Sequence, residues 1–411
     1  MQDGKEVRIL RDLAKAYMDV ARKDIQDERR ELWRKQNSLE RTRPLVLVMP
    51  AGRAWSETRE VDCVCEDPFY RGFERNFRRR IYMDFIGDDT VLEPWVTVGA
   101  HRWTPPEGPW GFTYDRFRSD DPDGAYLINP PLKRLEDIEK LPEIHHIIDE
   151  EATAQTTSRL KDAIGDLIEI GVDRAPAWRH WRGDISTDLG QLRGVEQMMW
   201  DMTQNREWLH RLVGAMSEGI QRVHREAEEA GDWRLNAHSN QAMPYSRELG
   251  DPRADGEPVT RDKLWYFAAA QEMAQVSPAM HEEFILNYQL PVLEKFGLVA
   301  YGCCEDYTHK IDMLRKVPNL RRIAVTPVAD VAKCAEQIGA DYVFSWRPNP
   351  SQMICCGWDP DLIRRVVRDA MEASKGCHVD ITLKDIESVQ GHPENLREWV
   401  KLVRSITDDY A

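Results

Sequence analysis

LVAYGCCED, residues 298–306, is a short apolar run that ends in two cysteines and two carboxylates. The run is too short for a good helix and suits a buried strand. Seven further short apolar runs, separated by helical patterns or loops, lie at residues 44–49, 91–98, 167–172, 233–238, 322–325, 341–346 and 378–383. Strands that alternate with helices pair in parallel through right-handed crossovers. The sequence therefore predicts an α/β fold, and eight such units favour a closed (β/α)8 TIM barrel.

Helical patterns lie between most of these runs. The predicted helices cover residues 194–231, 277–296, 328–338, 359–374 and 393–406. Ser277 and Pro278 begin one of them with a capping side chain and a proline at the first position. An open doubly wound sheet is the alternative architecture, but no Gly-x-Gly-x-x-Gly or Gly-x-x-x-x-Gly-Lys-Ser/Thr loop occurs. Because such loops hold phosphates, their lack argues against nucleotide binding.

The chain is divided into an N-terminal helical extension, residues 1–42, and the predicted barrel, residues 43–411. Ile9, Leu13 and Tyr17 recur near helical spacing in the extension, while Arg and Glu occupy the other positions. We therefore expect the extension to cover part of the barrel.

Two turn-rich sections, residues 101–131 and 245–258, follow the second and fourth predicted strands. Loops of such length in a compact domain are usually functional. At the C-terminal ends of barrel strands they would lie over the site. Surface decoration or an oligomer contact is the alternative, and the first section and the N-terminal helix are candidate surfaces for a homodimer.

Composition excludes several classes of protein. The 411 residues include 56 basic and 71 acidic side chains, a formal net charge of −15, which repels nucleic acid and anionic membranes. No stretch approaches the roughly 18 apolar residues of a membrane span, and the N-terminus lacks an apolar signal core. We expect a cytoplasmic protein. None of the eight cysteines forms a Cys-x-x-Cys pair, so free thiols are expected.

The strand at residues 298–306 carries the first candidate site. Alternation places Tyr301, Cys303 and Glu305 on one face. A thiolate can hold zinc or attack an electrophile, and a carboxylate can complete a metal site or move protons. The alternative is that the cysteines are small buried apolar residues, and which of Cys303 and Cys304 faces the site stays open.

Other predicted strands also end in polar residues. His238 ends the fourth and is a candidate metal ligand, base or hydrogen-bonded strand end. Arg347 and Asn349 follow the seventh, where a guanidinium and an amide suit a substrate carboxylate. A proline-built turn with a solvated Arg347 is the alternative. Lys384 and Asp385, with Glu387 nearby, follow the eighth and are candidates for base or ligand, although helix capping or surface charge would also explain them.

Arg53, just beyond the first strand, is a candidate for binding an anion, and Trp95 in the second strand is a candidate for contacting the substrate. By contrast, the arginine-rich run at residues 75–80 is interpreted as the solvated face of a helix.

Several segments resemble, in order, the uroporphyrinogen decarboxylase superfamily, which includes corrinoid-dependent methyltransferases. They are residues 43–53, which end in Ala-Gly-Arg, residues 188–202, the Ser-Pro-x-x-His-x-x-Phe helix at 277–284, the Cys303 strand, the Asn349-Pro350 turn and residues 393–396. The resemblance covers most of the chain from about Arg41 and implies the same barrel. For the methyltransferase branch it also implies zinc and a partner protein that carries a corrinoid.

Methyltransferase members hold zinc with His-x-Cys on the fifth strand and a cysteine after the eighth. Here Tyr301 takes the histidine position beside Cys303, and Asp385 or Glu387 lies near the last cysteine position. The full zinc signature is therefore absent. Oxygen and nitrogen also suit zinc, and the substitute ligand set consists of His238, Cys303, Glu305 and Asp385.

The sequence thus predicts a methyltransferase that moves a methyl group from a small methoxylated or methylated substrate to a corrinoid protein, with a metal as Lewis acid. The predicted catalytic residues are Glu305, Lys384 and Asp385, and the predicted substrate-binding residues are Arg53, Trp95, Tyr301, Arg347 and Asn349.

Two alternatives remain. One is a metal-free, decarboxylase-like lyase whose carboxylated substrate is held by Arg53 and Arg347. The decarboxylase branch, however, has an Asp near the second strand and a His after the eighth, where this chain has Leu92-Glu-Pro-Trp-Val96 and Lys384-Asp385. The other is a non-catalytic barrel that binds a corrinoid protein or a tetrapyrrole.

Overall fold

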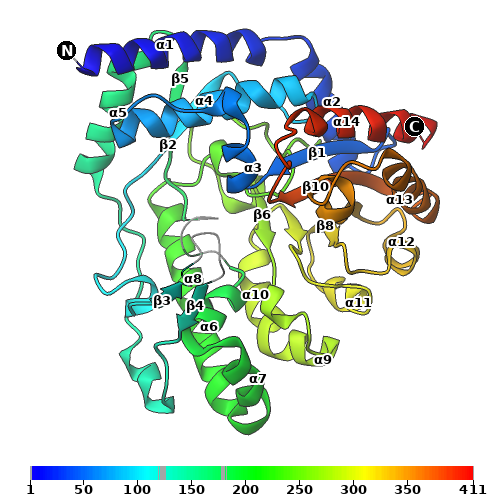
Figure 1. Ribbon diagram of the computed structural model, residues 1–411. Coiled ribbons are helices and arrows are strands. Elements are labelled where there is room, and N and C mark those ends of the chain that lie inside the picture. Colours follow the sequence, from blue (N-terminus) through cyan, green and yellow to red (C-terminus); the bar gives the residue numbers. More distant parts are fainter. Residues whose placement is uncertain (1, 119, 121–125, 177–180, 182, 411) are drawn as a thin grey trace.

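The computed structural model describes residues 2–118, 120, 126–176, 181 and 183–410 (Figure 1). A main sheet of six parallel strands has the order β1 (Leu45–Pro50), β10 (His378–Ile386), β9 (Val343–Trp346), β8 (Leu320–Val325), β7 (Leu298–Tyr301) and β6 (Trp265–Ala268). A second parallel sheet pairs β2 (Trp95–Gly99) with β5 (Glu169–Asp173). An antiparallel hairpin pairs β3 (Asp115–Arg118) with β4 (Tyr126–Asn129).

Helices connect these strands. They are α1 (Gln2–Ala21), α2 (Ile25–Asn37), α3 (Gly52–Ser56), α4 (Pro68–Ile86), α5 (Glu150–Ile164), α6 (Ser186–Arg193), α7 (Val195–Gln204), α8 (Arg206–Glu229), α9 (Pro278–His281), α10 (Asn287–Leu293), α11 (Ile311–Leu314), α12 (Val331–Ile338), α13 (Pro360–Ala373) and α14 (Glu394–Thr407). The helices α12, α13 and α14 confirm the last three predicted helices. Among the residues described, no helix is both long and apolar enough to cross a membrane.

Two predicted helices are interrupted. The helix expected at residues 194–231 is divided into α7 and α8 at Asn205, whose backbone leaves the helical region at φ −133°. The helix expected at residues 277–296 contains a π-helical turn, Glu282–Leu286, between α9 and α10. It continues through Pro291, which has no N–H to donate within the helix.

The parallel α/β prediction is confirmed, but the predicted closed barrel is not what the strand pairing shows. The main sheet curls into a half-barrel, and no ladder joins β1 to β2 in the described ranges. Side chains take the place of a neighbouring strand at the edge of β1. The Asp89 carboxylate accepts a hydrogen bond from Val46 N and the Asp88 carboxylate accepts one from Val48 N, both at 2.8 Å. These carboxylates satisfy edge donors that a closed barrel would pair with another strand.

The prediction of a strand at residues 233–238 is wrong. This segment contains a 3-10 turn, Leu235–Ala237, and the next strand is β6, which the sequence did not reveal. The segment still joins the two sheets: Asn236 Nδ2 donates to Val172 O at 3.0 Å, and Ser239 N donates to Trp265 O at 3.1 Å. A side-chain amide thus replaces part of a strand ladder.

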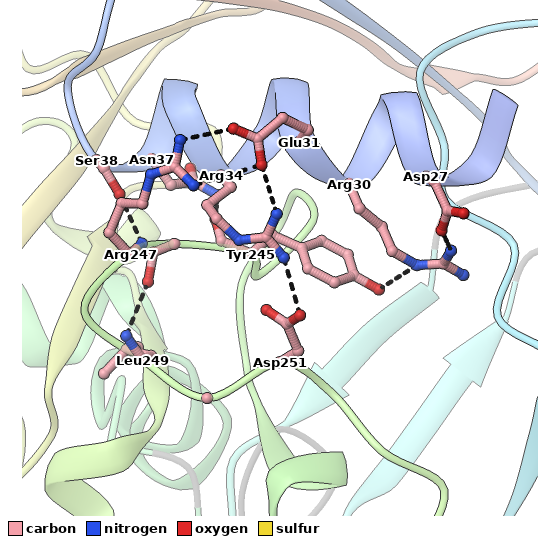
Figure 2. Close-up of polar contacts among 12 residues, drawn as sticks. Asp27, Arg30, Glu31, Arg34, Asn37, Ser38, Tyr245, Arg247, Leu249 and Asp251 are labelled. Atoms are coloured by element: carbon pink, nitrogen blue, oxygen red, sulfur yellow. Dashed lines mark hydrogen bonds and ion pairs between the residues drawn. The ribbon is translucent and has the colours of Figure 1, made fainter. Parts of the chain in front are cut away.

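The N-terminal helices α1 and α2 pack on the rest of the chain. Leu10 and Tyr17 of α1 are buried among residues of α4 and α5. The helix α2 lies against the chain that follows Ser239 (Figure 2). There Asn37, which is fully buried, donates from Nδ2 to Met243 O and Tyr245 O, each at 2.8 Å.

The turn-rich section at residues 245–258 is bound to the same helix. Arg34 forms an ion pair with Asp251 at 2.8 Å, and Arg247 forms one with Glu31 at 2.6 Å (Figure 2). This section is therefore anchored to the N-terminal extension. The other predicted lid, residues 101–131, includes the β3–β4 hairpin, and its residues 119 and 121–125 lie outside the described part of the chain.

Candidate functional site

The C-terminal ends of three parallel strands of the main sheet bring together the polar residues of the candidate site. Cys303 and Cys304 follow β7, Arg347 follows β9, and Lys384 lies near the end of β10. Because parallel strands point the same way, these ends meet at one edge of the sheet. The structure places Cys303, Arg347 and Lys384 at this shared edge, whereas His238, which was also expected there, is bonded to Trp265 N and Gly250 O.

Lys384 contacts both sulfur atoms. Its Nζ lies 3.3 Å from Cys303 Sγ and 3.3 Å from Cys304 Sγ, and the two sulfurs are 3.6 Å apart. Gln241 Nε2 donates to Cys303 Sγ at 3.5 Å. The half-buried Cys303 sulfur is therefore surrounded by donors, as a thiolate requires.

The two thiols titrate in opposite directions. Hydrogen bonding from Cys304, together with the charge of Lys384, lowers the pKa of Cys303 to about 5, although burial opposes this. The same hydrogen bond raises the pKa of Cys304 far above its usual value. In the singly ionised pair the two sulfurs share one proton, and the thiolate form is favoured at Cys303.

Lys384 stays charged beside this pair. Burial and the nearby Arg347 lower its pKa, but the sulfurs of Cys303 and Cys304 and the carboxylate of Asp385 raise it further, so the net pKa lies above the usual value. Asp385 Oδ2 is 3.1 Å from Lys384 Nζ and its side chain is 61 % exposed. The site therefore presents an ammonium group and a thiolate in direct contact.

Arg347, predicted to bind substrate, instead holds the site together. Its guanidinium donates to Cys303 O, to Gly302 O at 3.3 Å and to Gln241 Oε1. Because these bonds occupy both terminal nitrogens of a buried side chain, Arg347 is a positioning residue. Asn349 accepts from Ser351 N at 2.9 Å and forms a turn. The lyase alternative assigned a substrate carboxylate to Arg53 and Arg347, and the contacts of Arg347 with protein oxygens do not favour that role.

Glu305 is a buried acceptor with no room for substrate. It is 1 % exposed and accepts from Cys303 N and Cys304 N at 2.8 Å, from Ala270 N at 2.6 Å, and from Tyr307 OH. Four donors saturate this carboxylate. Its placement fits a role in shaping the cysteine turn and does not fit the predicted role of base or metal ligand.

Tyr301 faces the core. Strand alternation no longer applies beyond it because Gly302 has φ +106°, a conformation that favours glycine. A Cβ at this position would lie 2.6 Å from the Tyr307 ring. The Tyr301 hydroxyl, 3.3 Å from His281 Nε2, is buried, and burial raises its pKa well above the usual value. Tyr301 is thus not on the face of Cys303, and its placement does not fit the predicted contact with substrate.

His238 is engaged through both ring nitrogens. Nδ1 accepts from Trp265 N at 3.2 Å, and Nε2 donates to Gly250 O at 3.0 Å. Burial lowers its pKa to about 4, so the imidazole is neutral at neutral pH. The histidine replaces backbone pairing between its segment and β6 and leaves no lone pair for a metal.

The predicted zinc ligands therefore do not come together. Within the described ranges no group of three or more His, Cys, Asp or Glu side chains could hold a metal ion. The two thiols surround an ammonium group, whose positive charge opposes a cation there. As placed, these residues do not fit zinc.

Two other predicted residues lie apart from the thiolate. Arg53 is 58 % exposed on α3, 4.0 Å from Glu57. Since Ala51 N donates to Ile386 O at 3.0 Å, α3 begins at the same sheet edge as the site. Trp95 starts β2 in the other sheet.

Sequence reasoning missed Gln241. This residue lies in the irregular segment after His238, and a lone glutamine carries no motif that marks it. Its Nε2 contacts Cys303 Sγ, and its Oε1 accepts a hydrogen bond from Arg347, which follows a strand distant in the sequence.

Comparison with known proteins adds one similarity. The chain matches no known family model and no protein with a curated description. Among solved structures it is similar to a methyltransferase from Methanosarcina mazei, with 13 % sequence identity and a TM-score of 0.45 over 93 % of this chain and 98 % of that chain.

Proposed function

We propose that this protein is a methyltransferase that takes a methyl group from a small methoxylated or methylated substrate and passes it to a partner protein carrying a corrinoid. The observation that carries the proposal is the contact of Lys384 with Cys303 and Cys304 at the C-terminal edge of the sheet. The family resemblance of the ordered sequence motifs supports the same reaction class.

Lys384 is the proton donor in this proposal. When the bond between the methyl carbon and the substrate heteroatom breaks, the electron pair stays on the heteroatom, and Lys384 Nζ supplies a proton to it. The corrinoid would supply the nucleophile that takes up the methyl group. Cys303 keeps Lys384 protonated and oriented, and solvent returns the proton afterwards.

A test uses the reduced corrinoid protein with methanol, methylated amines and methoxylated aromatic compounds as donors. Formation of the methylcobalamin absorbance with at least one donor is expected, with loss of most of the rate in Lys384→Met. Lys333→Met, which removes an exposed lysine from α12, is the matched control. If no donor produces the absorbance, the proposal is wrong.

The low pKa of Cys303 favours a second candidate. In it, the thiolate itself attacks the methyl carbon, a sulfur–carbon bond forms, the carbon–heteroatom bond breaks, and Lys384 protonates the leaving heteroatom. Mass spectrometry of the Cys303 peptide after incubation with the donor alone would distinguish the two. A methyl group on Cys303 supports the second candidate, and an unmodified peptide together with corrinoid methylation supports the first.

A further inference from the structure

A large cleft lies beside the thiolate site and is not used by the chemistry described above. It has a volume of about 800 Å³ and opens between α4, the strands β2 and β5, and the segment at residues 236–240. Cavities of a few hundred to about 1,000 Å³ are typical of small-molecule sites. The cleft therefore has room for an organic ligand.

Three arginines of α4 line this cleft: Arg75, Arg79 and Arg80. They belong to the arginine-rich run at residues 75–80, which was expected to be the solvated face of a helix. In a chain with a net charge of −15, a local cluster of positive charge is unexpected. The fourth arginine of the run, Arg78, pairs with Glu74 at 2.9 Å and does not line the cleft.

Arg79 has unused hydrogen-bonding capacity. Its guanidinium lies over the Trp55 ring at 5.2 Å, and its buried Nε has no hydrogen-bond partner in the described part of the chain. Burial and the neighbouring Arg75 lower its pKa, which indicates a positive charge without a compensating anion. Arg80 donates to neutral oxygens only, Tyr17 OH at 3.0 Å and Trp95 O at 3.4 Å. Among the described residues, neither Arg79 nor Arg80 forms an ion pair with a carboxylate.

Two amides of the cleft wall are also incompletely bonded. Asn236 Oδ1 and Asn240 Nδ2 are buried without partners among the described residues. Asn236 Nδ2 donates to Val172 O and Ala254 O, so its oxygen is fixed as an acceptor. Buried polar atoms without partners are costly unless a ligand or water satisfies them.

The acidic side chain of the cleft is already paired. Asp173 lies 3.3 Å from Arg102 and accepts a hydrogen bond from Ala175 N at 3.2 Å. It therefore does not neutralise the arginines of α4. The cleft wall keeps a positive charge that an anionic ligand would balance.

We propose that this cleft binds a small organic oxyanion, a carboxylate or a phosphate monoester, with the anionic group at Arg79 and Arg75 and the neutral part near Asn240. Asn240 precedes Gln241, which contacts the Cys303 sulfur, so the inner wall of the cleft adjoins the thiolate site. Resting on the proposed function, the ligand is the methyl donor, which makes that donor an anionic methoxylated or methylated compound.

Calorimetry on the full chain tests the binding itself, with benzoate, phenyl phosphate and benzyl alcohol as probes of similar size. At least one anion is expected to bind more tightly than the neutral alcohol, and the tighter of the two anions identifies the preferred group. Equal binding of alcohol and anions, or no binding of either anion, would overturn the proposal.

Arg79→Gln and Arg78→Gln provide the matched pair of variants, since each removes one positive charge from the same helix. Losing a charge-assisted hydrogen bond should weaken binding of the preferred anion about tenfold or more in Arg79→Gln. Arg78→Gln, verified to be folded, should change it less than about twofold. Equal losses in both variants would mean that only general charge matters, which contradicts the assigned site.

The two proposals can fail separately. Lys384→Met should bind the preferred anion normally while methyl transfer is lost, and Arg79→Gln should raise KM for an anionic donor and leave kcat nearly unchanged. Anion binding that depends on Arg79, in a protein that transfers no methyl group, would retain the cleft site and reject the proposed function.

Discussion

Lys384 and Cys303 are 81 positions apart in the chain, yet Lys384 Nζ lies 3.3 Å from Cys303 Sγ. The lysine comes from β10 and the cysteine from the turn after β7, so the contact exists only because both parallel strands end at the same edge. Ion pairs in such a partly buried place are screened less than surface pairs. The contact stabilises the thiolate and the ammonium together.

Lys384→Met should raise the pKa of Cys303. The lysine charge favours the thiolate, so without it the thiol holds its proton to a higher pH. In the unmodified protein, alkylation of Cys303 by iodoacetamide should rise through pH 5 and level off. In the variant the midpoint should shift upward. Mass spectrometry of the Cys303 peptide separates it from the other cysteines.

Lys333→Met is the control for this titration, and its profile should match that of the unmodified protein. An unchanged midpoint in Lys384→Met would show that Cys304 and Gln241 alone stabilise the thiolate.

Glu305→Gln should destabilise the protein by about 1–3 kcal/mol, because an amide cannot accept from all four donors that now surround the carboxylate. The NH₂ group would also face donors such as Cys303 N. Urea unfolding measures the loss. Glu398→Gln, at an exposed ion pair with Lys401, should change stability by less than about 1 kcal/mol. A comparable loss in both variants would contradict the buried role of Glu305.

The sequence predicted the alternation of strands and helices because most strands form separate apolar runs. It failed where side chains replace backbone pairing. Asn236 and His238 connect their segment to the sheets, so the apolar run at 233–238 is not a strand, although its composition matches one. The strand β6 was missed because its four residues have no clear boundary in the sequence.

For the site, the sequence was informative where a residue type and a strand end coincided. Cys303, Arg347 and Lys384 were each expected near the C-terminal end of a strand, and they lie together at the edge where β7, β9 and β10 end. The role of Arg347 could not be predicted from the sequence. Its guanidinium is bonded to the carbonyls of Gly302 and Cys303, and these belong to a turn that is distant from Arg347 in the chain. Tyr301 was misplaced because one positive φ, at Gly302, ended the alternation that the prediction used.

Asp380→Ala should strongly destabilise the sheet. Asp380 accepts from Arg322 Nη2 at 2.6 Å and from Ser345 Oγ at 2.9 Å, and both charged side chains are buried. Leaving the Arg322 charge unpaired costs about 3–5 kcal/mol. Thermal or urea unfolding measures the loss. Asp361→Ala, which removes an exposed carboxylate from α13, should cost less than about 1 kcal/mol.

A double variant tests the reason for that loss. Arg322→Met with Asp380→Leu removes both charges, so it should recover much of the stability lost by Asp380→Ala. A double variant as unstable as the single one would mean that the shape of the packed core, and not the unpaired charge, determines the cost.

Asn37→Ala should weaken the attachment of α2 to the chain that carries Gln241. Asn37 donates to Met243 O and Tyr245 O and accepts from Arg322 Nη1 at 3.0 Å. Alanine leaves these buried groups unpaired, and we expect a loss of about 1–3 kcal/mol in urea unfolding. Because Gln241 belongs to the same segment, the alkylation midpoint of Cys303 should also move upward, by less than in Lys384→Met.

Ser38→Ala is the matched control for Asn37, since Ser38 bonds the same section from a more exposed position, accepting from Arg247 N at 2.7 Å. It should cost less than about 1 kcal/mol and leave the Cys303 midpoint in place. A variant of Asn37 that loses stability without any shift at Cys303 would show that α2 supports the fold but does not influence the thiolate.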